Sequence, residues 1–228
     1  MKKISAILAV LFLVCSVATG VSAHSSSQKN ILRSSLIPEY GNGVYYVGGE
    51  NVGWSIDESL HTNGTALYYK FSQNLSSARQ TIATDAAKKW KACSASLSNV
   101  GSSTSVPGVI GTISQASLSN SNIVAQFSGS AGANGHLTNW SIKFNTNCST
   151  SADSATIAHE LGHVYGLNDL YSTNDPDNRS RLMFGTTEST ATRPSYRDAQ
   201  GFWVITGKHT THSFSSSGVC SRCAGIKK

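Results

Sequence analysis

Residues 159–169 read HELGHVYGLND, with two histidines four positions apart and a glutamate directly after the first. On an α-helix, residues four apart lie on one face, about 40° out of register. The imidazoles of His159 and His163 can therefore converge on one metal ion. Glu160 points about 100° away from His159, outside the ligand set but within reach of a water molecule on that ion. This placement suits a general base.

The second half of the stretch supplies a chain reversal and a third ligand. Gly166 can adopt the left-handed conformation that ends a helix, so the chain can turn there and bring Asp169 back toward the histidines. Two imidazoles and one carboxylate leave the fourth tetrahedral position of a zinc ion open, which is typical of a catalytic rather than a structural site. We therefore predict a single catalytic Zn²⁺ held by His159, His163 and Asp169.

These residues resemble the motif of the metzincin zinc metallopeptidases, HExxHxxGxx followed by His or Asp. The Asp form, with Tyr171 and Ser172 close behind it, is most similar to the small bacterial snapalysin-type proteases. Metzincins also carry a methionine turn beneath the zinc, and Met183 lies where this turn would fall. Gly185 stands where many metzincins have a tyrosine, so any help from a tyrosine would have to come from elsewhere, such as Tyr171.

The resemblance covers roughly residues 65–207, and residues 194–207 are similar to the C-terminal helix of matrixin-type members. It implies an α+β, metzincin-like zincin fold. In this fold, a twisted mixed β-sheet with packed helices lies above an active-site cleft, and a small lower subdomain holds the methionine turn and the C-terminal helix. The implied function is that of a secreted zinc-dependent metalloendopeptidase. It would hydrolyse peptide bonds in a protein or peptide substrate through a zinc-activated water, with Glu160 as the catalytic general base.

Two alternatives concern this motif. In HExxH enzymes of the thermolysin kind a glutamate on a later helix completes the ligand set, and Glu188 falls 25 residues after His163. Its threonine-rich surroundings do not predict a helix, and Gly166 would then have no purpose, so Asp169 is favoured. The other alternative is a secreted zinc-binding adhesion or binding protein without turnover. Glu160 argues against it, because a zinc-only scaffold needs no base beside the metal.

The N-terminus has the pattern of a secretory signal peptide. Two lysines precede an apolar run over residues 4–14, and small residues follow at 21–23. We predict a signal peptide over residues 1–23, cleaved before His24, and hence a secreted, extracellular protein. The apolar run is shorter than the roughly 18 residues that a membrane span requires, and no later segment reaches that length. The sequence therefore predicts no membrane span.

The length of 228 residues indicates one domain with short appendages. We expect a pro-segment or flexible N-terminus over residues 24–42, a metalloprotease catalytic domain over 43–207, and a His/Cys-containing tail over 208–228. The net charge is +6 and falls to +4 without the two lysines of the signal peptide. Because the basic residues are scattered, the charge indicates no nucleic-acid partner, and we expect a monomer.

Four cysteines remain after the signal peptide. An even count in an oxidising compartment favours disulfide bonds, and four cysteines allow three pairings. One pairing joins Cys93 to Cys148, between the end of the first helix and the entrance of the active-site helix. The same pairing closes a short loop between Cys220 and Cys223.

The last part of the sequence offers further metal ligands. HxxH followed by CxxC in the tail could bind a second, structural zinc through His209, His212, Cys220 and Cys223, as an alternative to the local disulfide. Residues 174–178, NDPDN, offer oxygen ligands for Ca²⁺. An ordinary polar turn is the alternative that their Asp-Pro and Asp-Asn pairs favour.

Periodicity predicts the elements around the motif. Residues 66–71 and 138–145 alternate as strands do, apolar residues at fourfold spacing predict a helix over 78–90, and residues 97–135 are expected to hold two or three short strands. Thr150 and Asp153 form a capping pair for the active-site helix. Ser195 and Asp198 repeat this pattern for a C-terminal helix near residues 195–206 that ends at Gly207.

Overall fold

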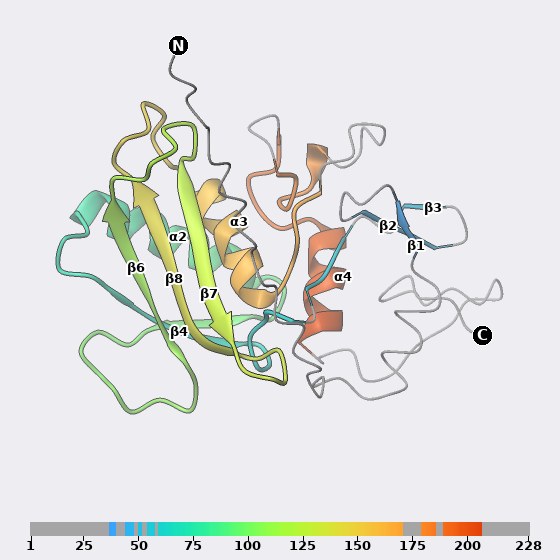
Figure 1. The fold of residues 1–228 in the computed structure, drawn as a ribbon, viewed down its shortest axis with the longest axis horizontal. Coiled ribbons are helices and arrows are strands. Elements are labelled where there is room, and N and C mark those ends of the chain that lie inside the picture. Colours follow the sequence, from blue (N-terminus) through green and yellow to red (C-terminus); the bar gives the residue numbers. More distant parts are fainter. Residues whose placement is uncertain are drawn as a thin grey trace, which may run out of the picture.

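The computed structural model describes residues 54–57, 59–170, 179–185 and 189–206, together with the backbone of three short strands nearer the N-terminus (Figure 1). These strands form an antiparallel sheet in the order β1-β2-β3. They are β1 (Ile37–Glu39), β2 (Val44–Val47) and β3 (Glu50–Asn51). The other described residues form a mixed α+β fold around a five-stranded sheet, as predicted.

The five-stranded sheet has the order β5-β4-β6-β8-β7. Its strands are β4 (Ala66–Phe71), β5 (Ser96–Asn99), β6 (Ile110–Ala116), β7 (Ala125–Ala131) and β8 (Leu137–Asn145). All neighbouring pairs are parallel except β7 and β8, which are antiparallel. The sheet is therefore mixed and mostly parallel, with one antiparallel edge strand.

The predicted alternation of strand residues is confirmed. Leu67 and Tyr69 are buried in β4, and Trp140, Ile142 and Phe144 are buried in β8. Because successive strand residues point to opposite faces of a sheet, these side chains share the face that the helices cover. The expected short strands between residues 97 and 135 are β5, β6 and β7.

The described residues form three helices, of which two pack on this sheet. Helices α2 (Ser77–Lys91) and α3 (Ser154–Tyr165) lie on one face of it, and α4 (Tyr196–Ile205) packs against α3 from the side away from the strands (Figure 1). The helix predicted over residues 78–90 is therefore confirmed as α2. Its buried side consists of Ala83, Ala86, Ala87 and Trp90, whereas Ala78, which belongs to the predicted apolar series, is exposed.

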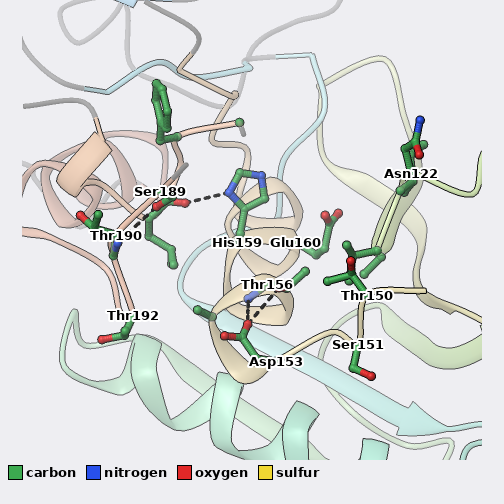
Figure 2. A pocket seen from close by; sticks show the side chains of 18 residues that line it. Asn122, Thr150, Ser151, Asp153, Thr156, His159, Glu160, Ser189, Thr190 and Thr192 are labelled. Atoms are coloured by element: carbon green, nitrogen blue, oxygen red, sulfur yellow. Dashed lines mark hydrogen bonds between the residues drawn. The ribbon is translucent and has the colours of Figure 1, made fainter. Parts of the chain in front are cut away.

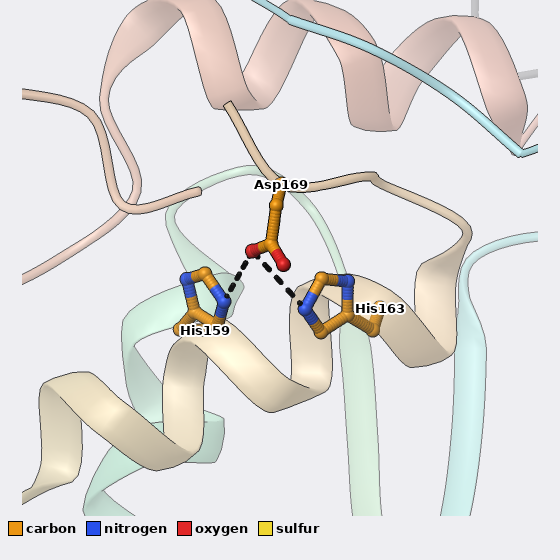
Figure 3. Close-up of side chains that lie close together, drawn as sticks. All are labelled: His159, His163 and Asp169. Atoms are coloured by element: carbon orange, nitrogen blue, oxygen red, sulfur yellow. Dashed lines mark ion pairs between the residues drawn. The ribbon is translucent and has the colours of Figure 1, made fainter. Parts of the chain in front are cut away.

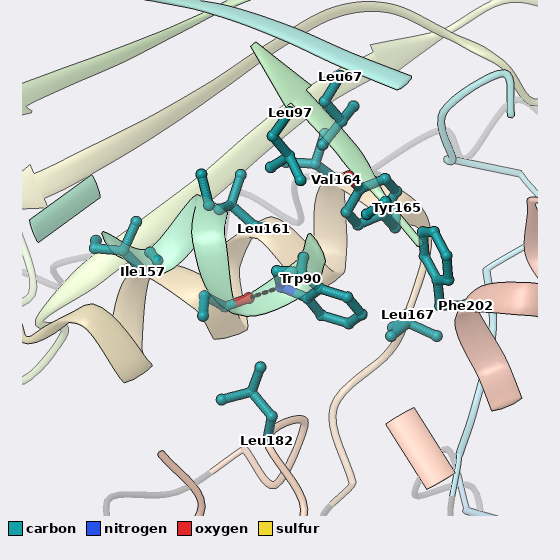
Figure 4. Packing of buried hydrophobic residues seen from close by; sticks show 14 of the residues in the cluster. Leu67, Trp90, Leu97, Ile157, Leu161, Val164, Tyr165, Leu167, Leu182 and Phe202 are labelled. Carbon is teal, nitrogen blue, oxygen red and sulfur yellow. Dashed lines mark hydrogen bonds between the residues drawn. The ribbon is translucent and has the colours of Figure 1, made fainter. Parts of the chain in front are cut away.

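Trp90 joins the three helices. Its side chain is fully buried, and its Nε1 donates a hydrogen bond to the carbonyl of Ala158 in α3 at 2.8 Å. Its ring centroid lies 5.4 Å from that of Tyr165 in α3 and 5.7 Å from that of Phe202 in α4 (Figure 4). Ile157, Leu161 and Val164 of α3 are also buried. One side of α3 is thus held rigidly.

Helix α3 starts later than the Thr150 capping pair predicts. Its N-cap is Asp153, whose carboxylate accepts a hydrogen bond from the Thr156 N–H at 2.8 Å. The Asp153 side chain caps a free N–H group of the first turn without help from Thr150. The predicted capping pair of Thr150 and Asp153 is therefore wrong. The capping box of Ser195 and Asp198 in α4 is confirmed. That helix ends at Ile205 with Thr206 as C-cap, and Gly207 lies outside the described residues.

The pairing of Cys93 with Cys148, one of the three that four cysteines allow, is not formed, because both cysteines are free. Helix α2 connects the parallel strands β4 and β5, so Cys93 at its end lies at the amino-terminal edge of the sheet. Cys148 follows the carboxyl end of β8, at the opposite edge. Burial and the charge of Asp198 raise the pKa of the Cys93 thiol to about 11, so the thiol stays protonated at neutral pH.

Several predictions concern residues outside the described ranges. These are the signal peptide, most of residues 24–42, Tyr171 with the acidic cluster at 174–178, Glu188, and the tail at 208–228. Among the residues that are described, no helix is both long and apolar enough to cross a membrane.

Replacing the central tryptophan tests the packing of the three helices. We expect Trp90→Ala to lower the free energy of unfolding by about 3–5 kcal/mol, because it removes a large buried ring and leaves a cavity. Trp90→Phe keeps most of the ring and loses the hydrogen bond to Ala158, so its loss should be smaller. Urea unfolding measures both values. A loss below about 1 kcal/mol for Trp90→Ala would contradict the central position of this residue.

Candidate metal centre

Helix α3 and the turn that ends it bring the three predicted metal ligands together (Figure 3). Gly166 is the C-cap of α3 in the left-handed conformation, with φ of 101°, and the chain reverses there as predicted. One Asp169 oxygen, Oδ1, lies 2.9 Å from His159 Nε2 and 3.4 Å from His163 Nε2. One ligand atom from each residue lies within 4.8 Å of the others, so the group could hold a metal ion.

Backbone carbonyls orient both imidazoles. His159 Nδ1 lies 2.8 Å from the Leu182 carbonyl oxygen, and His163 Nδ1 lies 2.7 Å from the Leu167 carbonyl oxygen. Since a carbonyl can only accept, each Nδ1 carries a proton, and each ring presents an Nε2 lone pair when it is neutral. The two rings are nearly perpendicular, at 88°, with centroids 4.8 Å apart. Two imidazole nitrogens and one carboxylate oxygen form a donor set that fits zinc.

The charges of the metal-free site favour a protonated imidazole beside an ionised carboxylate. Burial lowers the pKa of His159, but the hydrogen bond to Asp169 and the charges of Glu160 and Asp169 outweigh it and raise this pKa to about 9. Burial also acts to raise the pKa of Asp169, yet the hydrogen bonds from His159 and His163 bring it well below its usual range. A metal ion would take the place of the proton between these groups.

Glu160 lies beside the ligand group and bonds to the edge strand of the sheet. Its Oε2 accepts a hydrogen bond from the Phe127 N–H of β7 at 2.6 Å. The Phe127 ring stacks on His163, with centroids 6.2 Å apart and an interplanar angle of 26°. Burial raises the pKa of Glu160, against the opposing effect of the two histidines. A raised pKa brings the carboxylate closer to the range in which a general base is effective near neutral pH.

A cavity of about 520 Å³ opens next to these side chains, with His159 and Glu160 in its wall (Figure 2). Its other walls come from residues within 122–125 at the start of β7, 150–156 at the start of α3, and 189–192 before α4. The cavity is large enough to take a side chain of a bound molecule directly beside the carboxylate of Glu160.

Asp198 holds the turn at Leu182 and Met183, and the Leu182 carbonyl of this turn orients His159. The Asp198 side chain is buried, and its carboxylate accepts hydrogen bonds from the N–H groups of Leu182 at 3.0 Å and Met183 at 3.1 Å. The same carboxylate accepts from the Ser195 N–H at 2.7 Å as part of the cap of α4. Because the Leu182 carbonyl faces His159, the cap of α4 and the orientation of this imidazole depend on one carboxylate.

Met183 packs directly beneath α3. A side chain on Gly162, one residue before His163, would collide with Met183 Sδ and would lie 3.2 Å from the Trp90 ring. Gly162 therefore lets the turn approach the site helix closely. Met183 itself is buried.

The sequence did not identify every residue that shapes the site. It placed Asp198 only in a helix cap, since the Ser195 pattern reveals a local bond but not the contact with Leu182 and Met183. The Phe127 N–H has no sequence signal, because any residue can supply a backbone donor. Tyr171 and Glu188 lie outside the described residues, and Gly185 lies in the cavity wall.

A scan against models of protein families and a search of curated proteins found no match. The resemblance of residues 159–169 to metzincins therefore stays a prediction from the motif. Function has to be inferred from the side chains that the fold brings together.

The raised pKa of His159 predicts a pH-dependent metal affinity. Below pH about 9 the free site holds a proton on His159 that zinc must displace, so the apparent affinity should rise about tenfold per pH unit as pH increases toward that value. Above it the affinity should level off. Competition with a zinc chelator between pH 6 and 10 measures this dependence, and an affinity that is flat or falls over pH 6–9 would contradict it.

The role of Asp198 can be tested with Asp198→Asn. The amide retains one acceptor but directs an NH₂ group at backbone donors, so we expect a loss of about 1–3 kcal/mol in unfolding free energy and a fall in zinc affinity of about tenfold. Asp85→Asn is the matched control, because Asp85 is exposed and, among the described residues, its one ion pair is with Lys88; it should change neither quantity. Equal zinc affinity in Asp198→Asn and the unchanged protein would show that this carboxylate does not position His159.

Proposed function

We propose that this protein is a secreted zinc-dependent metalloendopeptidase that hydrolyses peptide bonds in proteins. The observation that carries the proposal is the convergence of His159, His163 and Asp169 next to the half-buried carboxylate of Glu160. A metal held only for structure would not require a carboxylate with a raised pKa beside its ligands. Such perturbed groups in a cavity are typical of catalytic sites.

In this proposal, Nε2 of His159, Nε2 of His163 and a carboxylate oxygen of Asp169 would hold the zinc ion. When bound, zinc polarises the scissile carbonyl and lowers the pKa of water to about 7. Glu160 takes a proton from the attacking water and passes it to the leaving amine. The Phe127 N–H keeps one oxygen of Glu160 in place, so the carboxylate is oriented before the substrate arrives.

The edge of the sheet and the cavity indicate how a polypeptide would bind. Among the described strands, β7 pairs with β8 alone, and the Phe127 N–H on its other side reaches the site. An extended substrate can align with such an edge through backbone hydrogen bonds. The cavity beside Glu160 then receives one substrate side chain. Both features favour an endopeptidase that acts on extended chain segments.

The finer fold that we propose is metzincin-like. The sheet with α2 and α3 corresponds to the upper part of the catalytic domain, residues 43–207. The turn at Met183 and α4 correspond to the smaller lower part. The support is the contact of Met183 with Gly162, beneath the helix that carries both histidines. We propose a monomer as the functional form, with a second zinc in the tail as the alternative to a Cys220–Cys223 disulfide.

Activity of the purified secreted protein tests this function. We expect hydrolysis of casein that a chelator abolishes and zinc restores. Glu160→Gln should lower kcat/KM by about 10²–10⁴-fold, because it removes the general base, while zinc remains bound. Glu188→Gln is the matched control and should retain both activity and zinc, since Asp169 is the proposed third ligand.

The outcomes separate the proposal from its rivals. Bound zinc without hydrolysis of casein or of a peptide library would indicate the binding protein rather than the enzyme. Loss of zinc from Glu188→Gln, with zinc retained by Asp169→Ala, would indicate a ligand set of the thermolysin kind. Two zinc ions per chain in place of one would indicate that the tail binds the second.

A further inference from the structure

The segment Trp54–Asp57 lies alongside the chain that leaves α3. The Asp57 N–H donates to the Gly166 carbonyl at 2.7 Å, and the Asn168 N–H donates to the Ser55 carbonyl at 3.0 Å. Ile56 and Leu167 form the antiparallel bridge between these two bonds. The loop that carries Asp169 is therefore one side of a short ladder whose other side comes from a segment about 110 residues earlier.

Side chains reinforce this ladder. Asn168 Nδ2 donates to Ser55 Oγ at 3.1 Å, and Ser55 is buried, with 1% of its surface exposed. Trp54 is buried as well and packs on α4, where a Cβ at Gly201 would lie 2.9 Å from the Trp54 Cβ and 2.8 Å from Leu167 Cδ2. The segment is thus anchored in the core at Trp54 and joined to the ligand loop at Ser55.

Two of the three candidate ligands depend on the position of this loop. The Leu167 carbonyl orients His163, and Asp169 follows Asn168 directly. Beyond Asp169 the chain is fixed by a bond from the Leu170 N–H to the Met183 carbonyl at 2.8 Å. The stretch from Gly166 to Leu170 is therefore held at one end by the segment Trp54–Asp57 and at the other by the turn at Met183.

We propose that residues 54–57 position the metal ligands, with Ser55 and Asn168 as a pair of positioning residues. This inference rests on the proposed function, and it also limits where the chain can be cut when the active enzyme is formed. Proteolytic processing that yields the active enzyme has to leave the chain intact from Trp54 onward, since a cut after Asp57 would release the strand that holds the ligand loop. The boundary of any removed pro-segment then lies before Trp54.

Zinc affinity of the full-length secreted chain tests the positioning pair. We expect Ser55→Ala and Asn168→Ala each to lower the affinity about tenfold to a hundredfold, the range found when partners behind metal ligands are removed. The zinc affinity of the double variant should be no lower than that of the single variant with the lower affinity, because both changes remove the same hydrogen bond. The visible absorption spectrum of the Co²⁺-loaded protein should change in all three variants, since the position of Asp169 in the ligand set changes.

Asn74→Ala is the matched control. It removes an asparagine hydrogen bond to a backbone carbonyl, from Asn74 Nδ2 to Gln115 at 3.0 Å, in the loop before α2. Zinc affinity and the Co²⁺ spectrum should stay unchanged in this variant. Thermal unfolding of the metal-free variants separates a general loss of stability from an effect on metal binding. If Ser55→Ala and Asn74→Ala unfold at the same midpoint temperature, Ser55→Ala should still bind zinc more weakly.

Unchanged zinc affinity in Ser55→Ala and Asn168→Ala, with zinc bound normally to the unchanged protein, would overturn this inference and leave the proposed function standing. A protein that binds no zinc at all would overturn both. N-terminal sequencing of the active secreted enzyme is the second measurement. We expect its first residue at Trp54 or earlier, and an active form that begins after Trp54 would overturn the limit on processing.

Discussion

The left-handed turn at Gly166 is the constraint on which the site depends. The two histidines follow from helical spacing alone, but the third ligand requires the chain to reverse immediately after the helix. With φ at 101° and the Cβ of His61 only 2.5 Å from where a side chain would begin, the position accepts glycine and little else. The reversal carries Asp169 to within 2.9 Å of His159 and 3.4 Å of His163.

The two histidines are oriented by different parts of the fold. His159 depends on the Leu182 carbonyl, and through it on the buried carboxylate of Asp198 in α4. His163 depends on the Leu167 carbonyl, and through it on the segment Trp54–Asp57. In the proposed zinc site, such supporting bonds keep the ligands in place before the metal binds, which lowers the free-energy cost of organising the site. The packing of α3 against Trp90 also fixes the helix that carries both histidines.

The local features of the site could be predicted from the sequence, and the long-range ones could not. Helical spacing placed His159 and His163 on one face, a glycine placed the turn, and alternation placed β4 and β8, because each depends on residues close together in the chain. The pairing of Cys93 with Cys148 failed because it required knowing at which edge of the sheet α2 ends. The contacts of Asp198 with the Met183 turn, and of Ser55 with Asn168, join segments whose proximity only the complete fold establishes.

X-ray absorption spectroscopy of the Cys220→Ser/Cys223→Ser protein, loaded with one equivalent of zinc, measures the central claim directly, because it reports the atoms bound to the metal and this variant lacks the thiols of the tail. We predict nitrogen and oxygen neighbours alone, at about 2.0–2.2 Å, with the outer scattering of two imidazoles. Asp169→Ala should remove one oxygen neighbour and leave the imidazole signal. A sulfur neighbour at about 2.3 Å, or a spectrum without imidazole scattering, would contradict the account.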